Sequence, residues 1–117
     1  MPLVSIVIRS RNEAAIIERT LAAIREQEMK DYEILAVDSS STDGTYEILQ
    51  KANIDQLWQI KSEDYVPGRV LNDAVKRCKG RFIVFNNADC VPVNSQWLGN
   101  LVKPLIAHPD TIAAYGR

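Results

Sequence analysis

The sequence predicts an α/β domain of three layers (α/β/α), in which a mainly parallel β-sheet lies between helices on both faces. Short runs of β-branched and other apolar residues alternate along the chain with segments whose apolar residues recur at helical spacing. This alternation is typical of a parallel sheet, because consecutive parallel strands need a long crossover connection that is usually a helix. The length of 117 residues, with 46% hydrophobic and 25% charged residues, is typical of one soluble globular domain.

The first half of the chain contains three predicted strands and two predicted helices. The strands are the runs Leu3–Ile8, Tyr32–Val37 and Gln56–Ile60. A helix is predicted from Asn12 to about Gln27, and the segment Ser10–Glu13 matches a capping box that would begin it. A second helix opens at the turn formed by Asp43 and Gly44, which we interpret as structural.

The second half begins with a polar loop, Lys61–Arg69, which runs into a helix from about Val66 or Gly68 to Cys78. The dipeptide Lys79-Gly80 ends that helix, since glycine is frequent just after a helix. The next predicted elements are a central strand at Phe82–Phe85, a helix from Asn94 to about Ala107 and a fifth strand at Thr111–Tyr115. We therefore expect about five strands and four helices.

Charge and cysteine content restrict the partners and the location. The net charge of −1 gives no reason to expect nucleic acid or an anionic membrane as a partner. The apolar run at the N-terminus is too short for a signal peptide or a membrane span. Cys78 and Cys90 lack CxxC spacing, and with the single His108 they cannot complete a four-ligand zinc site. Free thiols are typical of a reducing compartment, so we predict a cytoplasmic protein.

Polar side chains gather in the loops that follow the predicted strands. Ligands of open α/β sheets bind at the carboxyl ends of the strands, where the strand order reverses. The loops at those ends carry three aspartates and four basic residues: Asp38, Asp43, Asp89, Arg9, Arg11, Lys61 and Arg69. The loops at the opposite ends are shorter. The sequence therefore predicts a ligand site at the carboxyl edge of the sheet.

Three segments, VSIVIRSRNEA, EILAVDSSSTDGTYEIL and GRFIVFNNADCVP, resemble the family 2 glycosyltransferases. These are inverting enzymes of the glycosyltransferase A-type fold, which transfer a sugar from a nucleotide diphosphate donor. The resemblance covers nearly the whole chain in the right order and spacing. The nearest subset includes rhamnosyltransferase-like proteins of cell-surface polysaccharide synthesis.

The resemblance implies that residues 1–117 form a single nucleotide-sugar-binding domain, the Rossmann-like half of that fold. The acceptor-binding C-terminal half, in which the family carries its general base, would then be absent, and the resemblance implies no catalytic residue in this chain. Asp38 would hydrogen-bond the nucleotide base, and Asp89 would hold a divalent cation, Mn²⁺ or Mg²⁺, that bridges the diphosphate of a UDP- or dTDP-sugar. The other implied donor-site residues are Ser10, Arg11, Glu13, Ser39, Arg69, Asn72 and Asn87.

The chain departs from the family pattern at positions that bear on the site. Arg9 and Arg11 replace a proline and an aromatic residue, Ser39 replaces an acid, and Leu71 stands where an arginine is frequent. Asn87 replaces the first acid of the DxD motif, which removes one charge from the metal site. A carboxylate about 4 Å from a phosphate charge is repelled by roughly 4 kcal/mol at an effective dielectric of 20. Asp89 would therefore favour the donor only with a cation between them.

Other interpretations remain open at this stage. Arg9, Arg11 or Arg69 could hold the phosphates and leave the metal weak. A non-catalytic interaction or dimerisation module on the same fold is the alternative function, and a homodimer is predicted. A phosphoacceptor receiver-like domain would need an acidic pair after the first strand, where the chain has arginines. For single residues the structural alternatives are a helix cap at Asp38, a turn at Asp89, packing at Trp58 and Trp97, a small buried residue at Cys90 and a surface turn at His108.

Overall fold

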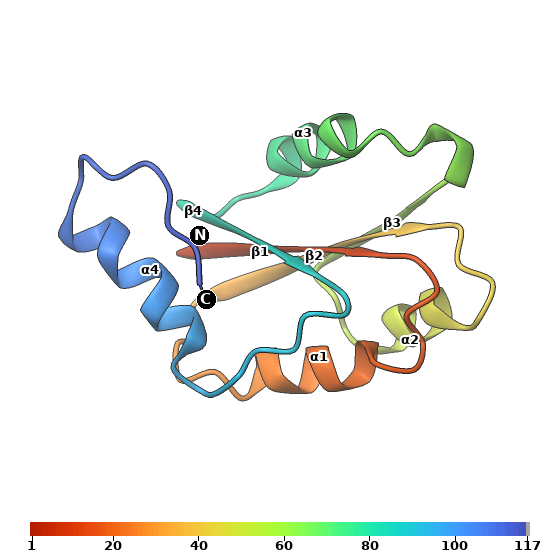
Figure 1. Cartoon of the computed structure of the whole chain (residues 1–117), viewed down its shortest axis with the longest axis horizontal. Helices are drawn as coiled ribbons and strands as arrows, with labels where there is room; N and C mark the ends of the chain where they lie inside the picture. Colours follow the sequence, from red (N-terminus) through yellow and green to blue (C-terminus); the bar gives the residue numbers. More distant parts are fainter. Residues whose placement is uncertain (117) are drawn as a thin grey trace.

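The computed structural model describes residues 1–116 and contains, in these residues, four strands and four α-helices that alternate along the chain (Figure 1). The elements are β1 (Val4–Ser10), α1 (Ile17–Arg25), β2 (Tyr32–Ser39), α2 (Thr45–Lys51), β3 (Gln56–Ile60), the short 3-10 helix η1 (Ser62–Asp64), α3 (Pro67–Arg77), β4 (Phe82–Asn87) and α4 (Trp97–Ala107). None of the helices within residues 1–116 has both the length and the apolar character needed to cross a membrane.

The four strands form one all-parallel sheet in the order β3-β2-β1-β4. Their carboxyl ends are aligned, because Ser10 pairs with Asp38 across β1 and β2, and Arg9 pairs with Asn87 across β1 and β4. The chain moves outward from β1 in one direction to β2 and β3, and then returns to the other side of β1 for β4. The strand order therefore reverses beside β1, which is the position where open α/β sheets bind ligands.

Both faces of the sheet are covered by helices, which confirms the predicted α/β architecture. In Figure 1, α1 and α2 lie below the sheet and α3 lies above it. Alternate side chains of β1 and β2, such as Ile6 and Ile34, join a buried cluster with α1, α2 and α4. The intervening residues, such as Val7 and Leu35, are also buried and face the side of α3. Burial on both faces explains why these strands read as nearly continuous apolar runs.

The first helix begins later than the capping box predicts. Asn12 has a φ of 52°, a left-handed conformation that no residue inside a right-handed helix adopts. The Ser10 hydroxyl does not cap a helix either, because it donates a hydrogen bond to Asp38 on the neighbouring strand. Residues 13–16 form a turn instead, and α1 starts at Ile17.

Two predictions about the second half of the sheet were wrong. Phe82–Phe85 lies in β4, which is an edge strand of the described sheet rather than a central one, and Phe85 is 52% exposed. Thr111–Tyr115 forms no strand: these residues are exposed, with Ile112 and Tyr115 almost fully open to solvent. An apolar run forms a strand only where a neighbouring strand accepts its backbone hydrogen bonds, and none lies beside these residues in the described part.

Candidate functional site

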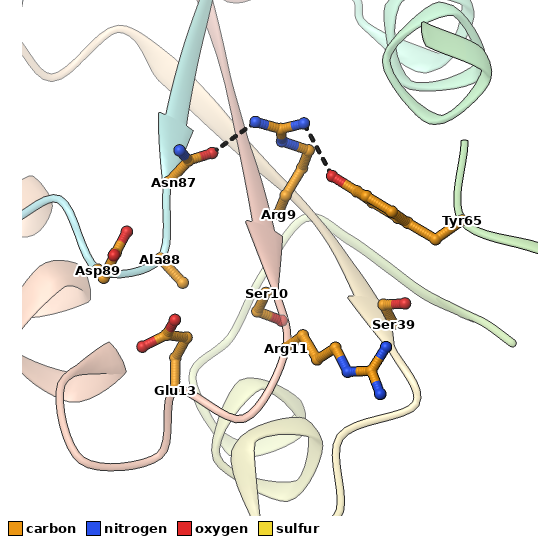
Figure 2. A pocket seen from close by; sticks show the side chains of 9 residues that line it. All are labelled: Arg9, Ser10, Arg11, Glu13, Ser39, Tyr65, Asn87, Ala88 and Asp89. Atoms are coloured by element: carbon orange, nitrogen blue, oxygen red, sulfur yellow. Dashed lines mark hydrogen bonds between the residues drawn. The ribbon is translucent and has the colours of Figure 1, made fainter. Parts of the chain in front are cut away.

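A cavity of about 310 Å³ lies at the carboxyl edge of the sheet, where β1, β2 and β4 end (Figure 2). Six of the nine residues predicted for the site line it, and Asp38, Arg69 and Asn72 do not. The full lining consists of Arg9, Ser10, Arg11, Glu13, Ser39, Tyr65, Asn87, Ala88 and Asp89. The site side chains therefore come from the ends of three strands and from the loop before α3.

Asp38 lies behind the cavity and is fully buried. Its Oδ1 accepts hydrogen bonds from the hydroxyls of Ser10 and Ser41, at 2.8 and 2.6 Å. Its Oδ2 accepts from the Ser41 N–H at 2.9 Å and from the Gln59 side chain at 3.1 Å. These four bonds occupy the acceptor capacity of a carboxylate, so contact with a nucleotide base would require one of them to open. In this structure Asp38 joins the ends of three strands.

Five hydrogen bonds join the loop after β1 to the loop after β2. They run from the N–H groups of residues 12, 13 and 14 to Ser41 Oγ, Thr45 Oγ1 and Asp43 Oδ2, and from the Thr42 N–H and hydroxyl to Asn12 Oδ1. Asp43 also accepts from the Thr45 N–H at the first residue of α2, and Gly44 has a φ of 97° in the turn. The structural interpretation of Asp43 and Gly44 is therefore confirmed.

Hydrogen bonding predicts a pH dependence of stability at Asp43. The Thr45 hydroxyl is the main cause that lowers the pKa of Asp43 below its ordinary value of 3.8. A carboxyl whose pKa is lower in the folded state stabilises it in full above the unfolded pKa, and this contribution is lost as the pH falls through the folded pKa. We therefore expect Asp43→Ala to be destabilising at neutral pH, and the difference from the wild type to shrink as the pH falls below the ordinary carboxyl pKa of 3.8.

Denaturant unfolding at a series of pH values measures this effect. Asp110→Ala, at an exposed position with no side-chain hydrogen bond in the described part, is the matched control and should follow the wild type at each pH. A difference between Asp43→Ala and the wild type that stays constant down to the lowest pH would contradict a role for the charged carboxylate.

The β1 end presents a guanidinium to the cavity. Arg9 donates from Nη1 to the Tyr65 hydroxyl at 2.9 Å and from Nη2 to Asn87 Oδ1 at 2.8 Å (Figure 2). The salt bridge found within residues 1–116 joins Arg77 to Asp73, so Arg9 has no carboxylate within ion-pair distance in that part of the chain. Both partners of Arg9 are neutral acceptors, and its charge is therefore available to a ligand.

Asp89 lies in the turn that follows β4 and is exposed to the cavity. The turn is fixed around it: the Ala88 N–H donates to Arg9 O, the Thr20 hydroxyl donates to Ala88 O, and the Asn86 side chain donates to Cys90 O. No group of three potential metal-ligating side chains occurs within residues 1–116. A hard cation at Asp89 would therefore need oxygens from a ligand, and Mg²⁺ and Mn²⁺ accept such mixed coordination with phosphates and water.

The cysteine beside Asp89 was predicted to be buried, and this was wrong: Cys90 is exposed. Desolvation is nevertheless the main cause that raises the pKa of the Cys90 thiol, and the neighbouring Asp89 carboxylate adds to it. Since the thiolate is the nucleophilic form, both effects disfavour reactivity. The structure therefore gives Cys90 no nucleophilic role.

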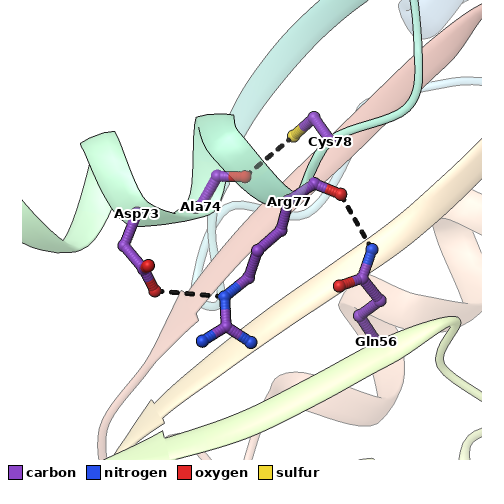
Figure 3. A network of polar contacts seen from close by, with 5 residues as sticks. All are labelled: Gln56, Asp73, Ala74, Arg77 and Cys78. Atoms are coloured by element: carbon purple, nitrogen blue, oxygen red, sulfur yellow. Dashed lines mark hydrogen bonds and ion pairs between the residues drawn. The ribbon is translucent and has the colours of Figure 1, made fainter.

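The remaining predicted residues lie away from the cavity. Arg69 and Asn72 are exposed on α3. Trp58 packs under the Arg77 guanidinium, whose carbon lies 4.1 Å from the ring centroid. Figure 3 shows this arginine bonded to Asp73, and its carbonyl oxygen accepts from Gln56. The packing interpretation of Trp58 is thus confirmed.

Two further structural interpretations are also confirmed. Trp97 packs against the buried cluster at the start of α4. His108 is an exposed residue at the end of the same helix.

Comparison with known proteins agrees with the observed fold. The model of the Glycosyl transferase family 2 matches residues 5–117. The glycosyltransferase AglE of Haloferax volcanii is 36% identical over 104 residues, which are 84% of this chain and 34% of the relative. The glucosyltransferase WfaP of Escherichia coli is 37% identical over 91 residues, 76% of this chain and 36% of the relative.

A solved structure of a glycosyltransferase also resembles this chain. The mannosyltransferase PcManGT from Pyrobaculum calidifontis, in complex with GDP-Man and Mn²⁺, superimposes with a TM-score of 0.77 at 31% identity. The match covers 89% of this chain and 32% of that one. The chain thus spans about a third of the length of the proteins it matches and has the parallel sheet of the glycosyltransferase A-type fold. By sequence and by fold, the chain belongs to glycosyltransferase family 2.

Proposed function

We propose that this chain is the donor-binding part of an inverting glycosyltransferase, and that it binds a nucleotide diphosphate sugar in the cavity at the carboxyl edge of the sheet. The proposal rests on one observation. Asp89 and the Arg9 guanidinium line the same cavity, which lies beside the point where the strand order reverses. That position is where open α/β sheets bind nucleotides. PcManGT, which superimposes on 89% of this chain, carries GDP-Man and Mn²⁺.

The six predicted site residues that line the cavity divide by position into two groups. Ser10, Arg11, Glu13 and Ser39, at the ends of β1 and β2, would contact the nucleoside, with Asp38 supporting them from behind. Asn87 and Asp89, at the end of β4, would face the diphosphate. Arg69 and Asn72 lie outside the cavity and are not included in these contacts.

Asp89 is the residue that would hold a divalent cation, Mn²⁺ or Mg²⁺, against the donor phosphates. Such a cation, when bound, stabilises the departing nucleoside diphosphate as a Lewis acid. The chain's own contribution is to fix the donor so that its anomeric carbon is presented to the acceptor hydroxyl. Inverting transfer also needs a general base for that hydroxyl, and none of the lining residues is proposed for it.

The proposed donor is a UDP- or dTDP-sugar, and the proposed setting is cell-surface polysaccharide synthesis. WfaP, 37% identical over its match, is named for UDP-Glc as its donor. The cytoplasmic location and the homodimer stay predictions of the sequence.

Calorimetric titration of UDP-, GDP- and dTDP-sugars into the whole chain, with Mn²⁺ or with EDTA, tests this function. We expect one donor to bind in Mn²⁺, and Asp89→Ala to weaken that binding by about tenfold or more, since tenfold corresponds to about 1.4 kcal/mol. Asp110→Ala is the control, because it removes a carboxylate that does not line the cavity, and it should bind like the wild type.

The outcomes separate the proposal from its alternatives. Absence of binding for every donor under every condition would reject the donor-site function and favour a non-catalytic module. The exposed Phe85 beside an apolar cavity of about 840 Å³ along β4 and α4 is the observation that favours such a module. Binding that is indifferent to both Mn²⁺ and Asp89 would keep the donor site and reject the metal.

A further inference from the structure

We propose that Arg9, held between Tyr65 and Asn87, binds the donor diphosphate directly, and that the uncharged amide at position 87 keeps this arginine available for it. The inference rests on the proposed donor function and adds a phosphate-binding residue that its metal site does not include. It makes donor binding in this cavity partly independent of a cation. Three observations carry it: the orientation of Arg9, the neutrality of its partners and the balance of charge around the cavity.

Arg9 is oriented by two hydrogen bonds that leave part of its guanidinium free. A guanidinium carries five N–H groups, and here one on each terminal nitrogen is used, for Tyr65 and for Asn87. The remaining N–H groups have no acceptor within the described residues. Figure 2 shows the planar group held between the end of β4 and the loop before α3, above the cavity. A fixed plane with free N–H groups is suited to a phosphate, which arginine binds through paired hydrogen bonds.

The amide of Asn87 determines how much of the charge on Arg9 remains. An aspartate at this position would place a carboxylate where Asn87 Oδ1 now lies, 2.8 Å from Arg9 Nη2. The two groups would then form an ion pair, and Arg9 would be neutralised within the protein. Asn87 accepts the same hydrogen bond without a charge, so it orients Arg9 and leaves its positive charge for a ligand.

Because the other charges that line the cavity are balanced, the charge at position 87 determines whether the cavity favours an anion or a cation. The lining contains two arginines, Arg9 and Arg11, and two carboxylates, Glu13 and Asp89. An aspartate at position 87 would add a third carboxylate, which would repel an anionic donor and would improve the site for a cation. The exchange of a carboxylate for an amide therefore trades cation binding for direct phosphate binding.

Tyr65 is the second residue that positions Arg9. It lies between η1 and α3, is 37% exposed, and reaches back across the cavity to accept the Arg9 hydrogen bond. Loss of the hydroxyl in Tyr65→Phe should leave the fold intact and release one side of the guanidinium. We therefore expect Tyr65→Phe to bind the diphosphate about threefold more weakly than the wild type, a smaller loss than that expected on removing the Arg9 guanidinium.

The test is calorimetric titration of pyrophosphate and of UDP, GDP and dTDP, in EDTA and in Mn²⁺, with folding of each variant checked by thermal unfolding. We expect wild-type binding of at least one of these ligands in EDTA, and Arg9→Gln to weaken it by about tenfold. Arg9→Lys, which keeps the charge and loses the planar fork, should recover part of the loss. Arg19→Gln, the same change at an exposed position of α1 that does not line the cavity, is the control.

Asn87→Asp is the more discriminating variant, because we expect it to weaken binding in EDTA but to increase the gain in affinity on adding Mn²⁺. Binding in EDTA should weaken, since Arg9 becomes neutralised, while the gain on adding Mn²⁺ should increase, since a second carboxylate faces the cation. If the wild type binds none of these ligands in either condition, the proposed donor function fails with the inference. If it binds in EDTA and Arg9→Gln binds equally well, only the inference fails. An Asn87→Asp variant that behaves like the wild type in both conditions would overturn the role of the amide.

Discussion

Replacing Gly80 by alanine is expected to lower the free energy of unfolding by about 3 kcal/mol, because the added methyl group has no room. A Cβ at this position would lie 2.5 Å from the backbone nitrogen of Ser5 and 2.7 Å from both the Ser5 hydroxyl and the Val4 carbonyl carbon. These are atoms of β1, which is paired on both sides and buried, so its backbone cannot move away.

The change would also disturb a buried polar network at the amino ends of the strands. The Gly80 N–H donates to the Ser5 hydroxyl at 2.8 Å, and that hydroxyl donates to Glu33 Oε2 at 2.5 Å. The same carboxylate oxygen accepts from the Lys79 N–H at 2.7 Å. Displacing Gly80 from Ser5 would leave buried partners unsatisfied, which adds to the steric effect.

Urea unfolding followed by circular dichroism measures the effect, with Gly68→Ala as the matched control. Gly68 lies in the first turn of α3, and an added methyl group there would have no atom of residues 1–116 within 4 Å apart from its chain neighbours and its own helix backbone. Alanine there should therefore be neutral or stabilising by about 0.5–1 kcal/mol. Equal midpoints for Gly80→Ala and the wild type would show that β1 and the loop before β4 can separate without loss of stability.

The second large effect is expected at Asp38, where alanine should reduce the free energy of unfolding by about 3 kcal/mol. Four hydrogen bonds converge on this buried carboxylate from Ser10, Ser41 and Gln59. Their removal leaves the buried Ser10 hydroxyl without its acceptor and breaks the side-chain link between the ends of three strands. Asp38→Asn, which keeps the shape and one acceptor oxygen, should lose less.

The comparison of stability with donor binding separates two roles of Asp38. A residue that organises the cavity loses stability and binding together when it is replaced by alanine. A residue that only contacts the base would keep the wild-type unfolding midpoint and lose affinity. We expect the first pattern, and an Asp38→Ala variant with unchanged stability would refute the organising role.

The order of strands and helices could be read from the sequence because most of it depends on local patterns. The strand at Gln56–Ile60 was predicted with its observed bounds, and three helices were located to within a few residues. The predictions failed where the local structure depends on contacts with segments that are distant in the sequence. Thr111–Tyr115 has strand-like residues but no partner strand among residues 1–116, while Asn12 takes a left-handed conformation that a capping-box pattern does not reveal.

The sequence indicated where the candidate site lies in the fold better than it indicated which side chains contact each other there. The carboxyl edge of the sheet follows from chain order, and Ser10, Glu13 and Asp89, which were expected at that edge, line the cavity found there. The contact of Arg9 with Tyr65 joins residues 56 positions apart, across a loop whose path the sequence does not specify. The burial of Asp38 was missed for the same reason, since its donors come from three separate segments.

The position of β1 in the middle of the sheet has a consequence for how the chain folds. This strand is synthesised before both of its neighbours, of which one begins at Tyr32 and the other only at Phe82. Until the later strand has left the ribosome, one edge of an apolar strand has no native partner, and such edges promote aggregation. Pairings between distant segments also form slowly. The yield of folded protein should therefore fall as the unpaired edge of β1 stays exposed for longer, and chaperones that shield it until β4 has been synthesised should raise that yield.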